Sequence, residues 1–206
     1  AALARFNADA AEITDIVITH NHSDHFDMES VKKIAGNGKI RLFGSPQVCA
    51  EAEVCCEVHP VSYGCRFQVA GFDFLALPAN HAVEDPYEDT FLYVISGGGR
   101  TLLYALDTAW FSSRAKRFLG TSYLDGIIWD ATMSEAGDWR VFDHSDPTMF
   151  RVIRKTLAQS RNIDEKTRIW FNHRARTLWP ADPAEQEKIA VRENAELAHE
   201  GEIVIF

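Results

Sequence analysis

The stretch Thr19–His25, which reads Thr-His-Asn-His-Ser-Asp-His, places three imidazoles and one carboxylate in a short turn. It directly follows the apolar run Ile16–Ile18, which is typical of a buried strand. Imidazole nitrogen and carboxylate oxygen suit zinc, manganese or iron, and ligands spaced two and three residues apart can face two adjacent ions. The stretch therefore predicts a metal-binding turn at a strand end, in preference to an ordinary polar surface turn.

Three further candidate ligands also stand directly after strand-like apolar runs, and they are His81, Asp107 and His173. Ligands that follow successive strands converge on one edge of a sheet, where a rigid scaffold can hold them together. The repetition of this arrangement along the chain therefore strengthens the prediction of a metal site.

The order of these motifs resembles the metallo-β-lactamase superfamily, whose signature is H-x-H-x-D-H after a hydrophobic strand. The resemblance covers nearly the whole chain and implies an α/β fold, the αββα sandwich, with a site for two divalent metal ions. The ligands it implies are His20, His22 and His81 for the first ion, Asp24, His25 and His173 for the second, and Asp107 as a bridge between both. Zinc is favoured, with manganese or iron as alternatives, because these ligand types do not distinguish them.

The same resemblance implies a hydrolase in which the two ions generate a hydroxide nucleophile from water. Asp24 and His144 are the candidate catalytic residues. His144 would donate a proton to a leaving alkoxide, and Asp143 would keep its imidazole protonated. The alternative for His144 is a surface residue that caps a helix. Arg174 and Arg176 flank His173 and are candidates for binding a phosphate.

The motif Asp130–Thr132 ahead of His144 is most similar to the phosphodiesterase branch of the family. We therefore expect hydrolysis of a small or cyclic phosphodiester. Two alternatives stay open. The first is hydrolysis of a lactone, thioester or β-lactam, and the second is a metal-binding module without catalytic activity. Trp110, Phe111 and Trp139 would line a pocket for a base or ring, or else pack into the core.

Length, composition and charge indicate the number of domains and the kinds of partner to expect. With 206 residues and 46% hydrophobic content, the chain (1–206) is expected to form one hydrolase domain. The net charge of −9 argues against extended nucleic acid as a partner, although residues 151–176 are rich in Arg and Lys. No apolar run approaches the roughly 20 residues of a membrane span, so no membrane partner and a cytoplasmic location are expected. A homodimer stays open. The cysteines, expected to be reduced, are Cys49, Cys55, Cys56 and Cys65.

Hydrophobic periodicity predicts alternating strands and helices. The strands are expected over 13–19, 40–43, 65–70, 72–78, 90–96, 101–106, 125–130, 167–172 and 202–205. The helices are expected over 28–35, 46–54, 112–119, 146–159 and 183–198, the last capped by Asp182 with Pro183 at its first position. Gly97–Gly99 predicts a hairpin turn. Because so little chain precedes strand 13–19, we expect the N-terminal strands of the fold to be missing and the edge beside this strand to be exposed or paired with a foreign strand.

Overall fold

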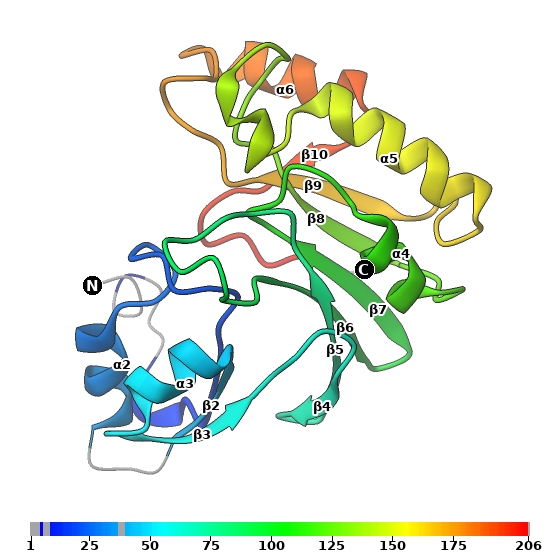
Figure 1. The fold of residues 1–206 in the computed structure, drawn as a ribbon. Helices are drawn as coiled ribbons and strands as arrows, with labels where there is room; N and C mark the ends of the chain where they lie inside the picture. The colour runs from blue at the N-terminus through cyan, green and yellow to red at the C-terminus, as the bar shows by residue number, and fades with distance from the viewer. Residues whose placement is uncertain (1–4, 6–8, 37–39, 206) are drawn as a thin grey trace.

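The strands of the computed structural model form two sheets, and the residues that it describes are Arg5, 9–36 and 40–205 (Figure 1). The smaller sheet is parallel, with the order β1 (Asp15–Val17), β2 (Ile40–Gly44), β3 (Cys56–Pro60). The larger sheet has the order β10 (Glu196–Leu197), β9 (Arg168–Asn172), β8 (Gly126–Asp130), β7 (Arg100–Ala105), β6 (Phe91–Gly97), β5 (Phe72–Pro78), β4 (Arg66–Val69). Strands β7 to β10 are parallel, and β4 to β7 pair antiparallel.

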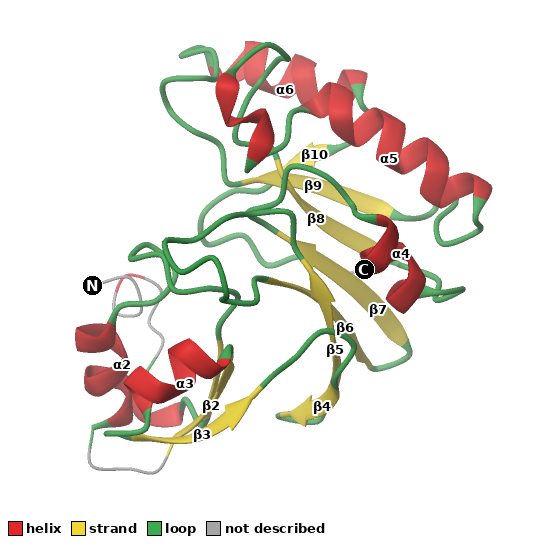
Figure 2. Ribbon diagram, in the orientation of Figure 1, coloured by secondary structure: helices red, strands yellow, loops and turns green. Residues whose placement is uncertain are grey.

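Helices cover the outer face of each sheet (Figure 2). Helices α2 (Met28–Ala35) and α3 (Pro46–Ala52) lie against the smaller sheet. Helices α4 (Ser113–Leu119), α5 (Pro147–Gln159) and α6 (Pro183–Arg192) lie against the larger one. The predicted αββα sandwich is therefore confirmed, with two helix layers outside two sheets.

Three buried clusters correspond to the three interfaces of the sandwich. In β2, Leu42 faces the cluster beneath α2 and α3, whereas the next residue, Phe43, faces the cluster between the sheets together with Tyr93. This alternation is the two-residue period of a strand with both faces covered. The largest cluster lies under α4, α5 and α6, where Trp129 and Phe150 are fully buried. The expectation that Phe111 packs in the core is confirmed, whereas Trp110 and Trp139 are exposed.

Local signals in the sequence explain most element boundaries. Asp182 caps α6 by accepting a hydrogen bond from the Ala184 N–H, and Pro183 opens the helix, as predicted. Gly98 and Gly99 form the β6–β7 hairpin turn with φ of 59° and 79°, a conformation that side chains disfavour. The four cysteines are free thiols, as expected.

Two predicted elements were wrong, and two elements of the structure were missed. The helix expected over 183–198 stops at Arg192, because Asn194 turns the chain with φ 52° and the residues that follow form β10. The strand expected over 202–205 is absent from the described tail, whereas β3 was not predicted. A short 3₁₀ turn, η2 (Trp139–Phe142), was also missed.

Strand β1 lies at the edge of its sheet. It pairs with β2 on one side and has no strand partner on the other among the described residues, in agreement with the expected open edge. Among the helices that the structure describes, none is long and apolar enough to cross a bilayer.

Candidate metal centre

The turn that follows β1 is fixed by backbone contacts from both sheets. The Ile18 N–H donates to the Phe43 carbonyl in β2 (2.8 Å), and the Tyr93 hydroxyl in β6 donates to the Ile18 carbonyl (2.7 Å). The Phe91 N–H donates to the Thr19 carbonyl (3.0 Å). The side chains of the turn therefore project into the junction between the sheets.

Glu88 also supports this turn from beneath. Its carboxylate is buried, accepts a hydrogen bond from the Ser45 hydroxyl at the start of α3 (2.9 Å) and interacts with the Asn21 N–H. Burial raises the pKa of Glu88, and these hydrogen bonds oppose the rise. The acidic loop 82–90 is thus anchored to the metal-binding turn through a buried carboxylate, although its sequence is typical of a solvated loop.

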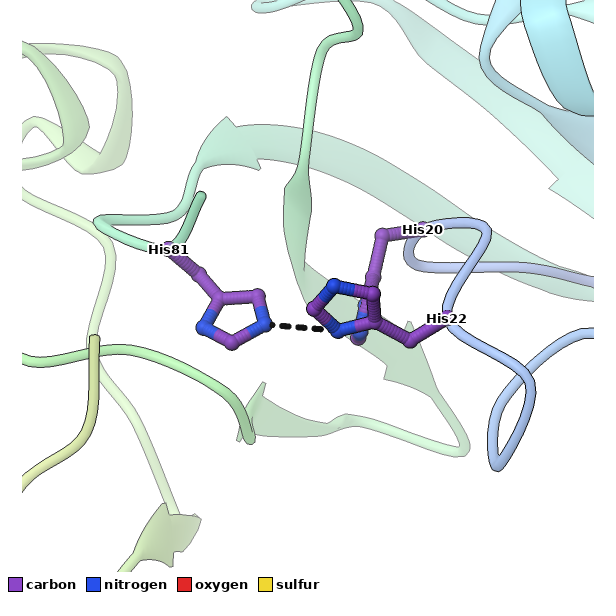
Figure 3. A group of neighbouring side chains, drawn as sticks. All are labelled: His20, His22 and His81. Carbon is purple, nitrogen blue, oxygen red and sulfur yellow. Dashed lines mark hydrogen bonds between the residues drawn. The ribbon is translucent and has the colours of Figure 1, made fainter. Parts of the chain in front are cut away.

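All seven predicted ligands come together in space. Donor atoms of His20, His22 and His81 lie within 4.8 Å of one another, with His81 Nε2 at 3.1 Å from His22 Nδ1 (Figure 3). In a second group the donor atoms also lie within 4.8 Å of one another. Its members are Asp24, His25 and His173, the ligands predicted for the second ion. The two groups match the division into two ion sites that the resemblance implies.

Asp107 lies between the two groups. Its Oδ2 is 3.1 Å from His25 Nε2, and its Oδ1 is 3.3 Å from His173 Nε2. It also forms a potential ligand set with His20 and His25. This position is the one that a bridging carboxylate requires. Asp24, by contrast, is largely exposed at the rim, 3.4 Å from His25.

The donor atoms are arranged as a metal site requires. His20 is buried, and its Nε2 has no hydrogen-bond partner in the described part of the chain. Burial, reinforced by the surrounding histidines, lowers the pKa of His20 to about 2, so the imidazole is neutral and keeps a free lone pair. Asp107 Oδ2 is likewise buried without a hydrogen bond among the described residues. Such unpaired buried atoms are costly unless a cation binds them, so these residues fit divalent metal ions.

Outer contacts orient three of the imidazoles. His20 Nδ1 contacts the Thr19 hydroxyl (3.0 Å), and His81 Nδ1 donates to the Asp143 carbonyl (3.0 Å). His173 Nδ1 contacts the Thr132 hydroxyl (2.8 Å). In each ring the Nδ1 atom is engaged outside the cluster, so Nε2 is the atom left to bind a metal.

His144 lies beside the ligands, and its ring stacks on that of His173 at 5.3 Å between centroids. Its Nδ1 contacts the buried Asp130 carboxylate (2.9 Å) and the Thr132 hydroxyl (3.2 Å). Burial lowers the pKa of His144, but the hydrogen bond and charge of Asp130 outweigh it, so the pKa is raised overall.

The direct carboxylate partner of His144 is Asp130, which was not predicted. The Asp143 side chain accepts a hydrogen bond from the Ala82 N–H (3.0 Å), and its charge adds a smaller contribution that also raises the pKa of His144. The alternative that His144 caps α5 is wrong, because Asp146 does so. Asp130 was missed as a site residue, although it ends a strand in the same way as the ligands; its position in the Asp130–Thr132 motif was the signal.

The two candidate arginines have different surroundings. Arg174 donates to Gln186 Oε1 (2.6 Å) and to the Ala198 carbonyl (2.9 Å), and it lies over the Trp179 ring. Its guanidinium therefore anchors α6, which favours a structural role. Arg176 is exposed and makes no hydrogen bond or ion pair with the residues that the structure describes.

A cavity of about 770 Å³ opens next to His173. Its walls include Thr132, Arg176 and His199. No local sequence signal places His199 here, since its position depends on the path of the chain after β10. The cavity joins a candidate metal ligand to an unpaired cation.

Comparison with known proteins identifies the fold family. A model of the beta-lactamase superfamily domain matches residues 2–169. A search of curated proteins found no match.

The structure is similar to a diphosphatase of the PhnP family, with 18% identity, TM-score 0.69 and coverage of 97% of this chain and 72% of that one. It is also similar to Zn²⁺-bound PqqB from Methylobacterium extorquens (17%, 0.70, covering 94% and 73%). A third similar structure is an isothiocyanate hydrolase from Delia radicum gut bacteria (13%, 0.68, covering 95% and 77%). At these identities the structures show a shared fold. With the match to the family model over most of its length, the chain belongs to the metallo-β-lactamase superfamily of metal-dependent hydrolases.

Proposed function

We propose that this protein hydrolyses a small or cyclic phosphodiester and that it does so with two divalent metal ions, of which zinc is favoured over manganese or iron. The observation that carries the proposal is the contact of His144 with Asp130 directly beside the seven candidate ligands. Such a pair is suited to proton donation, which an alkoxide leaving group needs. The similarity to a PhnP-family diphosphatase supports the same choice.

The ligand residues would hold the ions as the two groups described above, with Asp107 between them. When bound, the ions would polarise the phosphoryl group and make a water molecule more acidic. The remaining work falls to residues of the chain. The Asp130 carboxylate accepts a hydrogen bond from Nδ1–H of His144 and fixes the ring, which leaves Nε2 to carry the proton that reaches the leaving oxygen.

Arg176 would bind the anionic substrate from the cavity beside His173. Its guanidinium has no partner within the described residues, so its charge is available to a phosphate oxygen. Arg174, with its donors engaged by Gln186 and Ala198, would hold this wall of the cavity in place.

The substrate class is tested by assaying bis(p-nitrophenyl) phosphate and a small cyclic phosphodiester against a panel of lactones and thioesters. We expect turnover of the phosphodiesters. Turnover confined to the lactone panel would replace the proposal by its carbon-centred alternative. The remaining alternative is a binding module without catalytic activity. Metal analysis after purification without chelator tests it, because fewer than about one ion per chain would favour such a module.

The role of His144 is tested by its dependence on the leaving group. The substitution His144→Asn should lower kcat by about 100-fold or more for an alkyl leaving group and much less for p-nitrophenolate, which departs without a proton. Metal content should stay unchanged. Equal losses for both leaving groups would show that His144 does not donate the proton.

A further inference from the structure

Two aromatic side chains stand exposed on η2, which ends two residues before His144. Trp139 is 70% exposed and Phe142 is 77% exposed. A 3₁₀ helix has 3.0 residues per turn, so side chains three positions apart are eclipsed. The indole and the phenyl ring therefore leave the same side of the turn, and we call this pair of exposed rings the aromatic platform. Single exposed hydrophobic residues are ordinary, but two eclipsed rings beside a candidate active site are not.

The aromatic platform is tied to the metal centre through the residue that follows it. The Asp143 carbonyl accepts a hydrogen bond from Nδ1 of His81, and its side chain accepts one from the Ala82 N–H, both at 3.0 Å. Phe142 precedes His144 by two residues, so their Cα atoms are at most about 7 Å apart. The platform is thus fixed beside the residue that would protonate the leaving group.

The Trp139 ring is also supported in its exposed position. The Arg140 guanidinium lies 5.0 Å from its centroid. Arg140 is itself held by both carboxylate oxygens of Asp138, at 2.9 and 2.8 Å. A cation over one face orders the ring, and an ordered ring loses less freedom when a ligand stacks on it.

We propose that the aromatic platform stacks a planar ring carried by the substrate, so that the substrate is a phosphodiester of a nucleoside or another aromatic alcohol. This inference rests on the proposed function and specifies its substrate class. Stacking supplies affinity without positive charge, which suits a chain of net charge −9. It also tolerates different bases, because every base has an aromatic face.

The test compares two five-membered cyclic phosphates of similar reactivity, adenosine 2′,3′-cyclic phosphate and glycerol 1,2-cyclic phosphate. Trp139→Ala and Phe142→Ala should each lower kcat/KM for the adenosine compound about tenfold and leave the glycerol compound unchanged. Trp139→Phe should keep most of the preference. Val54→Ala, which removes a similarly exposed apolar side chain in the turn after α3, is the matched control.

An unchanged ratio between the two substrates in the alanine variants would overturn the aromatic platform while leaving the phosphodiesterase proposal intact. If neither compound is hydrolysed, the proposed function fails. A binding measurement then still tests whether the aromatic platform stacks a planar ring. Calorimetry on the metal-loaded protein should show adenosine 3′-monophosphate binding about tenfold more tightly than glycerol phosphate, with the difference lost in Trp139→Ala. Equal binding would refute the platform. So would light scattering that shows a dimer dissociating in Trp139→Ala with the substrate ratio unchanged, since the rings would then join two copies of the chain.

Discussion

Asp107 and His173 hold backbone conformations that residues with side chains rarely adopt, with φ of 52° and 59°. A non-glycine residue in this region costs about 1–3 kcal/mol and persists where the surroundings determine it. Asp107 lies two residues after β7, and His173 directly follows β9. Both side chains point into the cluster. The strain is therefore located at two of the residues that the metal centre needs.

The substitution Asp107→Asn tests the bridging position with little risk to the fold, because asparagine tolerates the left-handed region as well as aspartate does. It removes the negative charge that the two ion sites share, so we expect the loss of at least about one ion per chain and a fall in hydrolysis of about 100-fold or more. Metal content by mass spectrometry and kcat/KM are the measurements. His199→Asn, outside the cluster, is the control for metal content. Full metal content in Asp107→Asn would contradict the assignment.

At the scale of residues, spacing predicted the ligands because each follows a strand, and because three imidazoles and a carboxylate in one short turn are typical of metal sites. Asp130 was missed as the partner of His144 because the Asp130–Thr132 motif was used only as a mark of the family, and a strand-end carboxylate also resembles an ordinary capping residue. The cavity wall was beyond prediction for a different reason. Whether Arg174 is free depends on Gln186 and Ala198, which reach it only after α6 and β10 have packed.

At the scale of elements, an ion pair joins α5 to the end of α6. Arg151 Nε donates to Glu193 Oε2 (2.7 Å), and Glu193 is buried at the α6 C-terminus. The hydrogen bond from Arg151 lowers the pKa of Glu193 below its usual 4.5. A lowered carboxyl pKa stabilises the fold above the unfolded-state pKa, and this stabilisation is lost as the pH falls through the folded-state pKa.

Glu193→Gln should therefore reduce the free energy of unfolding by about 1–2 kcal/mol at pH 7. The difference between variant and parent should shrink as the pH falls below about 4.5, where the parent loses its own carboxylate charge. Urea denaturation between about pH 3 and pH 7 measures both effects. Glu185→Gln breaks an exposed ion pair with Lys188 on the same helix and should change stability by less than about 0.5 kcal/mol. If the two substitutions change the free energy of unfolding equally, the buried ion pair stabilises the fold no more than the exposed one does.

Element prediction succeeded where capping residues and hydrophobic periodicity agreed. Helix α2, for example, has the expected bounds, Met28–Ala35. It failed where a single residue overrode the pattern. The apolar periodicity of α6 continues past Arg192, but Asn194 adopts φ 52° and places Leu197 beside Phe171 in β9. Strand β3 carries a mixed polar pattern and ends at Pro60, so its pairing with β2 comes from tertiary packing.

At the scale of the whole molecule, the metal centre lies at the junction of the two sheets. The smaller sheet contributes the turn after β1, and the larger sheet contributes His81, Asp107 and His173 after β5, β7 and β9. The cores beneath α2 and α3 and beneath α4 to α6 are separate clusters. Ions bound here would connect the two layers of the sandwich, so metal binding should stabilise the molecule as a whole.

Metal removal tests this connection. A ligand present at about 100 times its Kd adds about 2.7 kcal/mol to the free energy of unfolding, which for a chain of this size is a rise in Tm of about 5–10 °C. We expect zinc to produce such a rise in chelator-treated protein and to slow amide hydrogen exchange in both Thr19–Phe26 and Asp107–Trp110, because each sheet contributes ligands. Asp107→Asn should weaken both effects, and His199→Asn should show both in full. Protection confined to Thr19–Phe26 would mean that the ions bind the turn alone and do not bridge the sheets.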